Sequence, residues 1–283
     1  MITDRIIDRA RSSRAIIAIG AEEGYERKVI ESAEKAEEAG YARVVIVSRE
    51  PLVTDIANVT SPSPAARLVE LLKTGEVAGI VRGSLDVNPV MAAMKEEFGV
   101  EKLLRLGILR TPPGQPFFFA PVGIDDAWRV KEKIELGALG ADLMRKLGVE
   151  EDIAVLGGGR KGDIGRSTIT DRSIRAAEKA ADGLRKKGYR ATCMYILLEE
   201  AIGKYNFILA PDGISGNLIY RSLCLVGEGS GMGGPCRGGR FRLRRYIPGG
   251  EKLSERNLLC LRACRIDLRV WITSLRRSSL PLS

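Results

Sequence analysis

Histidine is absent from this chain of 283 residues. Its absence excludes Ser-His-Asp and Cys-His catalysis and every metal site that depends on imidazole ligands. Acid–base chemistry is therefore left to carboxylates, lysine, tyrosine, cysteine or the substrate itself. A substrate phosphate can act as its own nucleophile, so chemistry on phosphate is compatible with this composition. We expect no metal site.

Long hydrophobic runs and paired cysteines are also lacking. No stretch approaches 18 uninterrupted apolar residues, and residues 1–5 (MITDR) do not resemble a signal peptide. We therefore expect a cytoplasmic protein without a membrane partner. The five cysteines show no paired spacing, which predicts no disulfide framework, and Cys193 and Cys224 lie in apolar segments typical of a core.

The net charge of +9 belongs entirely to one end of the chain. Residues 1–235 balance, with 33 Lys plus Arg and 33 Asp plus Glu, whereas residues 236–283 hold 12 basic and 3 acidic residues. A pI near 9.4 would ordinarily indicate nucleic-acid binding. Because the body of the chain carries no excess charge, we expect no nucleic-acid partner.

The segment 205–221 (YNFILAPDGISGNLIYR) predicts a buried strand, a sharp polar turn and a helix. We expect Gly216 and Asn217 to open the helix, with Asp212 in the turn before it. The first N–H groups of a helix lack intrahelical partners, and together with the macrodipole they attract anions. The alternative is an ordinary turn in which Pro, Asp, Gly and Asn only shape the backbone.

A second predicted strand, 153–156, runs into the glycine-rich segment 157–167 (GGGRKGDIGRS). Glycines allow the backbone to approach an anion closely, and Arg160, Lys161 and Arg166 supply positive charge. We expect a helix to follow, capped by Thr170 or Asp171. The alternative is a charged surface loop without a ligand.

This glycine-rich segment partly matches two nucleotide-binding motifs, but its context fits neither. Gly157, Gly159 and Gly162 satisfy G-x-G-x-x-G, yet the next helix starts too late and no acidic residue ends a second strand about 20 residues on. Lys161 is followed by Gly rather than Ser or Thr, which excludes a P-loop. An adenosylmethionine-type glycine loop would lack its usual acid.

Strands alternate with helices elsewhere, which predicts an α/β fold with mostly parallel sheets and ligands at the carboxyl ends of strands. Arg82 and Ser84 follow a strand, so they either bind a ligand or cap the next helix. Asp125 or Asp126 is expected to cap a helix ending at Leu147. The strand-like segments are 14–20, 44–47, 78–81, 103–109 and 117–122, and the helical ones are 25–40, 66–72, 88–98 and 126–147.

The sequence motif P-D-x-x-x-G-N-x-x-Y-R at 211–221 resembles the P-[DN]-x-x-x-G-N-x-x-Y-K turn of phosphate acetyl- and butyryltransferases. Lys161-Gly162 resembles the K-G of that family's S-x-S-x-K-G turn, although glycines replace its serines. The resemblance implies acyl transfer between an acyl thioester and phosphate, with a coenzyme A thioester as substrate and no required cofactor. It also implies a homodimer and a phosphate site made by Arg160, Lys161, Gly162, Ser167, Asp212, Gly216, Asn217, Arg82 and Ser84.

The same resemblance implies the two-domain α/β fold of phosphotransacetylases and isocitrate/isopropylmalate dehydrogenases, with mostly parallel sheets and helices on both faces. The proline-rich segment 111–116 is the expected junction. We therefore expect a first domain of residues 1–112 plus 236–283 and a second of residues 113–235, with the site in the interdomain cleft.

Three sequence segments are similar to those of an archaeal methanogenesis-marker group described as a methyltransferase subunit. They are APVGIDD at 120–126, LLEEAI at 197–202 and PDGISGNLIYR at 211–221. This similarity implies a methyl donor and a methyltransferase complex as partner. A third interpretation is a non-catalytic binding subunit, because Met91–Lys95 lacks the arginine that phosphotransacetylases carry in that helix.

Residues 236–283 differ from the rest of the chain. Arginine outnumbers lysine there 11 to 1, and three of the five cysteines appear. The run 240–245 (RFRLRR) is either a basic strand, an RNA-contacting arm or the product of a shifted reading frame.

Read one base later, the codons from Cys236 permit Val-Glu-Gly-Val-Asp-Phe-Val-Phe-Val-Asp-Thr-Ser-Arg. Phosphotransacetylases carry an Asp-x-Ser-Arg turn here, soon after a Gly-Pro that matches Gly234-Pro235. Nucleotide sequence of the 3′ end tests this hypothesis, and under it Cys260 and Cys264 are not ligands.

Overall fold

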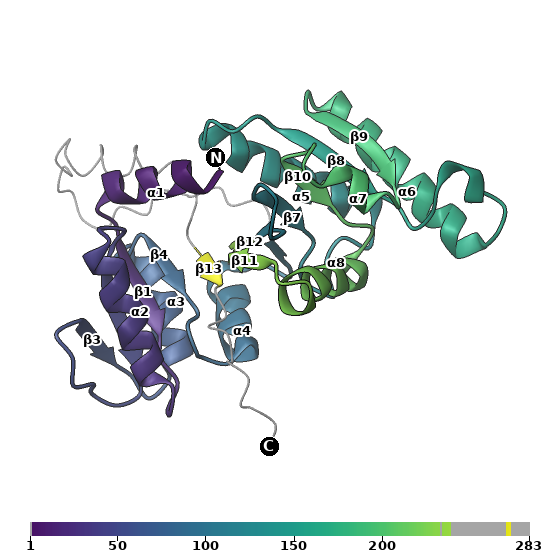
Figure 1. Ribbon diagram of the computed structural model, residues 1–283. Helices are drawn as coiled ribbons and strands as arrows, with labels where there is room; N and C mark the ends of the chain where they lie inside the picture. The colour runs from purple at the N-terminus through teal and green to yellow at the C-terminus, as the bar shows by residue number, and fades with distance from the viewer. Residues whose placement is uncertain (1, 233, 239–269, 273–283) are drawn as a thin grey trace, which may run out of the picture. The chain divides into compact units, whose positions relative to one another are not determined.

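The computed structural model describes residues 2–232, 234–238 and 270–272. The chain divides into two compact units (Figure 1). The first unit contains residues 7–103 together with 235–238 and 270–272, and the second contains residues 2–6 and 104–234. The expectations placed on 240–245, Cys260 and Cys264 lie outside the described residues.

The first unit is built on a sheet of strand order β3-β2-β1-β4-β13-β12-β5. Its first four strands along the chain, β1 to β4, pair in parallel, and β13 adds to β4 in the same direction. The strands are β1 (Ile16–Gly20), β2 (Arg43–Ser48), β3 (Ala57–Thr60), β4 (Gly79–Val81), β5 (Leu103–Arg105), β12 (Gly234–Gly238) and β13 (Val270–Ile272).

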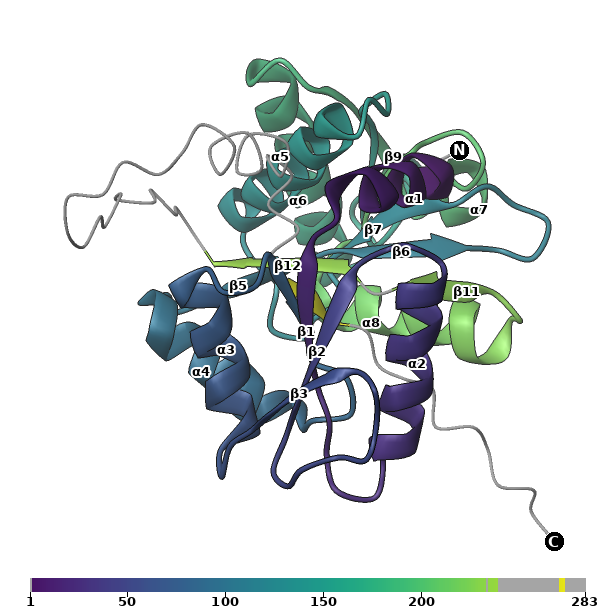
Figure 2. The same cartoon turned by 90° about the vertical axis from the view of Figure 1, so that its left-hand side faces the viewer.

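Helices cover both faces of this sheet (Figure 2). Successive residues of β1 point to opposite sides, so its side chains pack against both helix layers. Ile19 packs with Val29 and Ala33 of α2 (Glu26–Glu38). Ala18 packs on the other face, where Leu68 and Met94 belong to α3 (Pro64–Thr74) and α4 (Val87–Phe98). A further helix, α1 (Ile2–Ser13), precedes β1.

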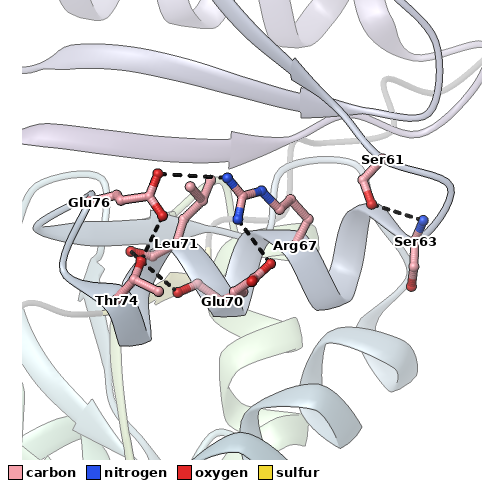
Figure 3. Close-up of polar contacts among 7 residues, drawn as sticks. All are labelled: Ser61, Ser63, Arg67, Glu70, Leu71, Thr74 and Glu76. Carbon is pink, nitrogen blue, oxygen red and sulfur yellow. Dashed lines mark hydrogen bonds and ion pairs between the residues drawn. The ribbon is translucent and has the colours of Figure 1, made fainter. Parts of the chain in front are cut away.

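Polar contacts secure both ends of α3 (Figure 3). At its start Ser61 Oγ accepts a hydrogen bond of 3.1 Å from the Ser63 N–H, just before Pro64 at the first helical position. At its end Thr74 Oγ1 donates to the Glu70 carbonyl at 3.1 Å. Arg67 forms ion pairs with Glu70 and Glu76, at 2.9 Å and 3.6 Å. Gly75 then ends the helix with φ of 80°, which glycine adopts without strain.

The second unit is built on a sheet of order β11-β6-β7-β10-β8-β9. β7, β10, β8 and β9 run parallel, and β6 and β11 are antiparallel additions at one edge. The segment 111–116, expected as the domain junction, connects β6 to β7 inside this sheet. The strands are β6 (Gly107–Arg110), β7 (Phe117–Ala120), β8 (Asp152–Leu156), β9 (Arg190–Tyr195), β10 (Phe207–Leu209) and β11 (Ser230–Met232).

The aromatic run of β7 belongs to the core. Phe117, Phe118 and Phe119 are each at most 2% exposed. Phe117 and Phe119 join the cluster that α7 (Leu198–Ala201) and α8 (Gly213–Arg221) cover. The other long helices of the unit are α5 (Val130–Lys146) and α6 (Thr168–Lys186), which pack against each other and the sheet (Figure 1).

The expected α/β pattern is confirmed, but segment 103–109 forms two strands, β5 and β6, rather than one. Three predicted helix starts are also wrong. Asp125 and Asp126 do not cap the long helix, which begins at Val130 after Arg129. Ser167, and neither Thr170 nor Asp171, caps α6 through a 3.3 Å contact with the Ile169 N–H. The helix after β10 begins at Gly213 rather than at Gly216.

Candidate functional site

Three turns of the second unit follow neighbouring parallel strands of its sheet. β7, β10 and β8 are neighbours, with Leu209 paired with Ala120 on one side and with Val155 on the other. Because the three strands are parallel, the segments that follow them all lie at the carboxyl ends of the strands, where ligands bind in α/β sheets. These segments are 121–129, 211–213 and 157–167, and they are called here the β7, β10 and β8 turns.

The β10 turn ends in a capped helix start. Asp212 is the N-cap of α8, and its Oδ1 accepts a hydrogen bond of 2.8 Å from the Ser215 N–H. Its Oδ2 accepts a second, of 3.0 Å, from Ser215 Oγ. The Gly216 N–H already donates to the Asp212 carbonyl at 2.9 Å. The helix starts at Gly213, so the N–H groups at its start lie before Gly216 rather than after it.

Two glycines let α8 lie directly on the β7 turn. A Cβ atom on Gly213 would stand 2.1 Å from the Gly123 carbonyl oxygen, and one on Gly216 would stand 2.1 Å from the Pro121 carbonyl oxygen. Asn217 adds a hydrogen bond of 2.9 Å from Nδ2 to the Val122 carbonyl. Gly216 and Asn217 therefore seat the helix, which is a structural role that their motif did not reveal.

The β7 turn is held by two cationic side chains that sequence reasoning missed. Arg105 pairs with Asp125 and, at 3.1 Å through Nε, with the buried Asp126. Lys133 of α5 is only 4% exposed, and its Nζ donates to the Ala127 carbonyl at 2.5 Å. The available signal for Lys133 was helical spacing, because it shares a face with buried residues three, four and seven positions on.

Burial changes the acidity of the groups beneath the β7 turn. Desolvation lowers the pKa of Lys133, while the charges of Asp212 and Glu132 oppose that change. Desolvation also raises the pKa of Asp126, and the contact with Arg105 offsets this only in part. The pKa of each group therefore differs from its value in solution, as is common for ionisable groups at binding sites.

The β8 turn is exposed and keeps its charges near the surface. Its first residues are tied down, since the Gly157 N–H donates to the Tyr195 carbonyl at 2.7 Å and the Gly158 N–H to Ser173 Oγ at 2.9 Å. Asp163 accepts from the Arg160 N–H at 2.8 Å. These contacts leave the Lys161 side chain exposed, without a hydrogen bond or ion pair to any described residue.

Other charged groups of the β8 turn bind one another. Asp163 Oδ1 accepts from Arg166 at 2.7 Å, so Arg166 is less available to a ligand than its sequence position suggested. The Arg160 N–H, followed by Arg166, lowers the pKa of Asp163. Gly162 has open space around its Cα, and Ser167 is occupied as the cap of α6.

Arg82 and Ser84 belong to the first unit and are described there alone. Ser84 Oγ accepts a hydrogen bond of 2.8 Å from the Glu22 N–H, which ties the turn after β4 to the turn after β1. Arg82 donates to the carbonyl of Leu85, and its buried Nε has no partner among the described residues. Burial lowers the pKa of this guanidinium. Asp86, and neither of these two residues, is the N-cap of α4.

The described residues contain no cluster of three or more His, Cys, Asp or Glu side chains arranged to bind a metal ion. Within the same residues, no helix combines the length and apolarity needed to cross a membrane. Neither Cys193, which is half-buried, nor Cys224, which is buried, forms a disulfide bond within the described residues.

Sequence comparison relates the chain to archaeal proteins. It is 38% identical over 238 residues to a protein of Methanosarcina mazei named "Putative methyltransferase mtx subunit X", covering 83% of this chain and 85% of the relative. It is 40% identical over 229 residues to the protein of the same name from Methanosarcina barkeri, covering 80% and 84%. No family model matches the chain.

Comparison of structures identifies the fold. A branched-chain phosphotransacylase from Enterococcus faecalis superposes with a TM-score of 0.66 at 18% identity, over 90% of this chain and all of that one. A phosphotransacetylase from Streptococcus pyogenes gives 0.65 at 16% identity, over 94% and 98% of the two chains. The fold is therefore of the phosphotransacetylase type, as the motifs at 161–162 and 211–221 implied.

Proposed function

This chain belongs to the family of the archaeal mtx subunit X proteins, and from that premise we propose that it binds a phosphate or phosphoester at the β8 and β10 turns of its second unit. We further propose that it is a transferase, moving an acyl group between an acyl thioester and phosphate. The fold of phosphotransacetylases supports this reading, and a coenzyme A thioester is the proposed donor.

One observation carries the proposal: the two turns follow adjacent parallel strands, since Leu209 of β10 pairs with Val155 of β8. One turn offers the first N–H groups of α8, and the other offers Lys161, whose side chain has no partner among the described residues. A helix start and a free ammonium are complementary to an oxyanion. Arg160, beside Lys161 and also exposed, adds a second cation.

The proposed reaction needs no histidine. An oxygen of hydrogen phosphate attacks the thioester carbonyl carbon, the C–O bond forms and the C–S bond breaks. The phosphate proton passes to the departing sulfur, so the products are an acyl phosphate and a thiol. Cationic and N–H donors at the two turns stabilise the negative charge that develops on the carbonyl oxygen and phosphate. Asp212 and Asn217 orient the helix start rather than react.

A second candidate is a subunit of a methyl-transferring complex, which the name shared by the archaeal relatives favours. In that case the bound phosphoester belongs to a methyl donor or its carrier, and a methyltransferase is the partner. The two candidates share the anion site and differ in the group transferred. A homodimer is compatible with either.

Anion binding is tested by isothermal titration calorimetry with inorganic phosphate, acetyl phosphate and coenzyme A. We expect Lys161→Ala to weaken phosphate binding about tenfold, because it removes an ion-pair partner of the anion. Lys186→Ala is the matched control, at the far end of α6 about 27 Å along the helix axis. Equal affinities for all three proteins would reject the site.

Transfer chemistry is tested separately with a chain whose 3′ reading frame has been established by nucleotide sequencing. Formation of acyl phosphate from acetyl-coenzyme A and phosphate would support acyl transfer. No activity with any acyl thioester, together with copurification of a methyltransferase, would reject acyl transfer and favour the second candidate.

A further inference from the structure

The chain carries a buried ammonium beside the proposed anion site. Lys133 is 4% exposed, yet only one hydrogen bond satisfies it, from Nζ to the Ala127 carbonyl at 2.5 Å. An ammonium has three N–H donors, and the other two have no hydrogen-bond partner among the described residues. A buried lysine is costly unless a negative charge lies near it, so its position calls for an electrostatic explanation.

Asp212 adjoins the β7 turn, to which Lys133 is bonded. Ala127, which accepts from Lys133, is in the β7 turn, and Gly213 packs against Gly123 and Ile124 of the same turn. The N-cap carboxylate immediately before Gly213 is therefore close to the ammonium. Asp212 is also the chief influence favouring the charged form of Lys133, ahead of Glu132 on α5. Asp125 and Asp126, the two acids of the β7 turn, are both paired with Arg105.

A carboxylate cap creates a conflict at an anion site. Asp212 is a strong cap because it accepts from both the Ser215 N–H and its Oγ. Its negative charge, however, lies at the N–H groups where a phosphate would bind, and like charges repel strongly in a partly desolvated site. The helix start attracts an anion only if that charge is balanced.

We propose that Lys133 is the positioning residue that balances Asp212, so that one carboxylate caps α8 while the helix start remains open to a phosphate dianion. This inference rests on the proposed function for its ligand and on the buried contacts of Lys133 for its mechanism. Lys133 does not itself touch the phosphate. It acts through the charge of Asp212 and through the Ala127 carbonyl.

The binding test is a pair of variants measured by calorimetry with inorganic phosphate. Lys133→Met keeps the length of the side chain, and it should weaken phosphate binding about tenfold because Asp212 is left unbalanced. Adding Asp212→Asn should restore affinity to within about threefold of wild type, since asparagine still caps a helix but carries no charge. Lys131→Met, an exposed lysine of the same helix, should bind like wild type.

Two results would overturn the inference. One is unchanged affinity in Lys133→Met, and the other is a double variant that binds as weakly as the single variant. A merely structural lysine gives the second result, because removing a further charge does not repair a disturbed turn. Circular dichroism spectra and urea midpoints of each variant establish that the proteins compared are folded.

A second measurement does not depend on any ligand. The pKa of Lys133 is followed by NMR of ¹³Cε-labelled lysine in wild type and in Asp212→Asn. We expect the pKa to fall in the variant, because the charge that favours the ammonium is gone. An unchanged pKa would overturn the pairing even if phosphate binds. If the wild-type chain binds no phosphate although the pKa responds to Asp212, the proposed function fails and the charge pairing is retained.

Discussion

The β10 and β8 turns follow neighbouring strands of one sheet and are built in opposite ways. In the β10 turn and the start of α8 the polar side chains have protein partners: Asp212 bonds with Ser215, and Asn217 bonds with the Val122 carbonyl. Glycines there bring backbone against backbone. In the β8 turn Lys161 is exposed without a described partner, and Gly162 has open space around it. The difference indicates that the β10 turn provides a fixed helix start, whereas the β8 turn, under the proposed function, would provide the charge that responds to a ligand.

The comparison predicts its largest effect at the glycines. Gly216→Ala should destabilise the protein by roughly 3 kcal/mol, because the new Cβ would meet the Pro121 carbonyl, a backbone atom that cannot rotate away. Gly162→Ala should change stability by no more than about 1 kcal/mol, in the stabilising direction, since nothing lies within 4 Å of its Cβ. Urea unfolding of the two variants measures the difference, and equal effects would remove the contrast between the turns.

A smaller effect is expected at Asn217. Asn217→Ala removes the hydrogen bond from Nδ2 to the Val122 carbonyl and should cost about 1 to 2 kcal/mol of stability. Lys161→Ala should alter stability by less than about 0.5 kcal/mol, because the side chain is exposed. Thermal unfolding without ligand tests the pair. A loss of stability in Lys161→Ala larger than that in Asn217→Ala would contradict the assignment of roles.

The smallest effect concerns acid stability of the β8 turn. The Arg160 N–H and Arg166 lower the pKa of Asp163 below its usual 3.8. A carboxyl group with a lowered pKa in the folded state contributes stability that is present above about pH 4 and is lost as the pH falls through the folded value. Asp163→Asn should therefore show a shallower loss of stability between pH 4 and pH 2 than wild type, measured by urea midpoints. A steeper loss would reverse the sign and contradict the contact.

Bound ligand should sharpen the contrast further. A ligand at 100 times its Kd raises the free energy of unfolding by about 2.7 kcal/mol when it binds only the folded state. Thermal shift with phosphate should therefore be reduced in Lys161→Ala, which lacks the ammonium of the β8 turn. It should stay near the wild-type value in Lys186→Ala. An undiminished shift in Lys161→Ala would transfer the site to another part of the molecule.

The fold was largely predictable because its strands and helices have strong local patterns. The buried strands 153–156 and 207–209 were located to within a residue or two. The segment 103–109 was predicted as one strand, but it forms β5 and β6, which belong to different sheets. Periodicity does not distinguish a long strand from two short ones when both are buried. The helix α1 and the strand β3 were not predicted at all.

The site was less predictable because its supporting contacts are long-range. The turn at 211–217 could be recognised from Pro, Asp, Gly and Asn in close succession, but the helix start was misplaced by three residues. The capping geometry of Asp212, which sets that start, depends on backbone angles that the sequence pattern does not determine. Lys133 was missed because a lysine in a helix ordinarily lies in solvent. Only the fold reveals that its Nζ donates to the Ala127 carbonyl.

The seating of α8 on two glycines has a practical consequence. Since Gly213 and Gly216 fix the inner side of the helix, its outer side is left largely independent of that seating, and Ile214 and Leu218 are 51% and 59% exposed there. A cysteine introduced at either position would carry an environment-sensitive dye within about two turns of the capped end. Such a labelled protein would report arrival of a charged metabolite by fluorescence, without knowledge of the reaction that follows.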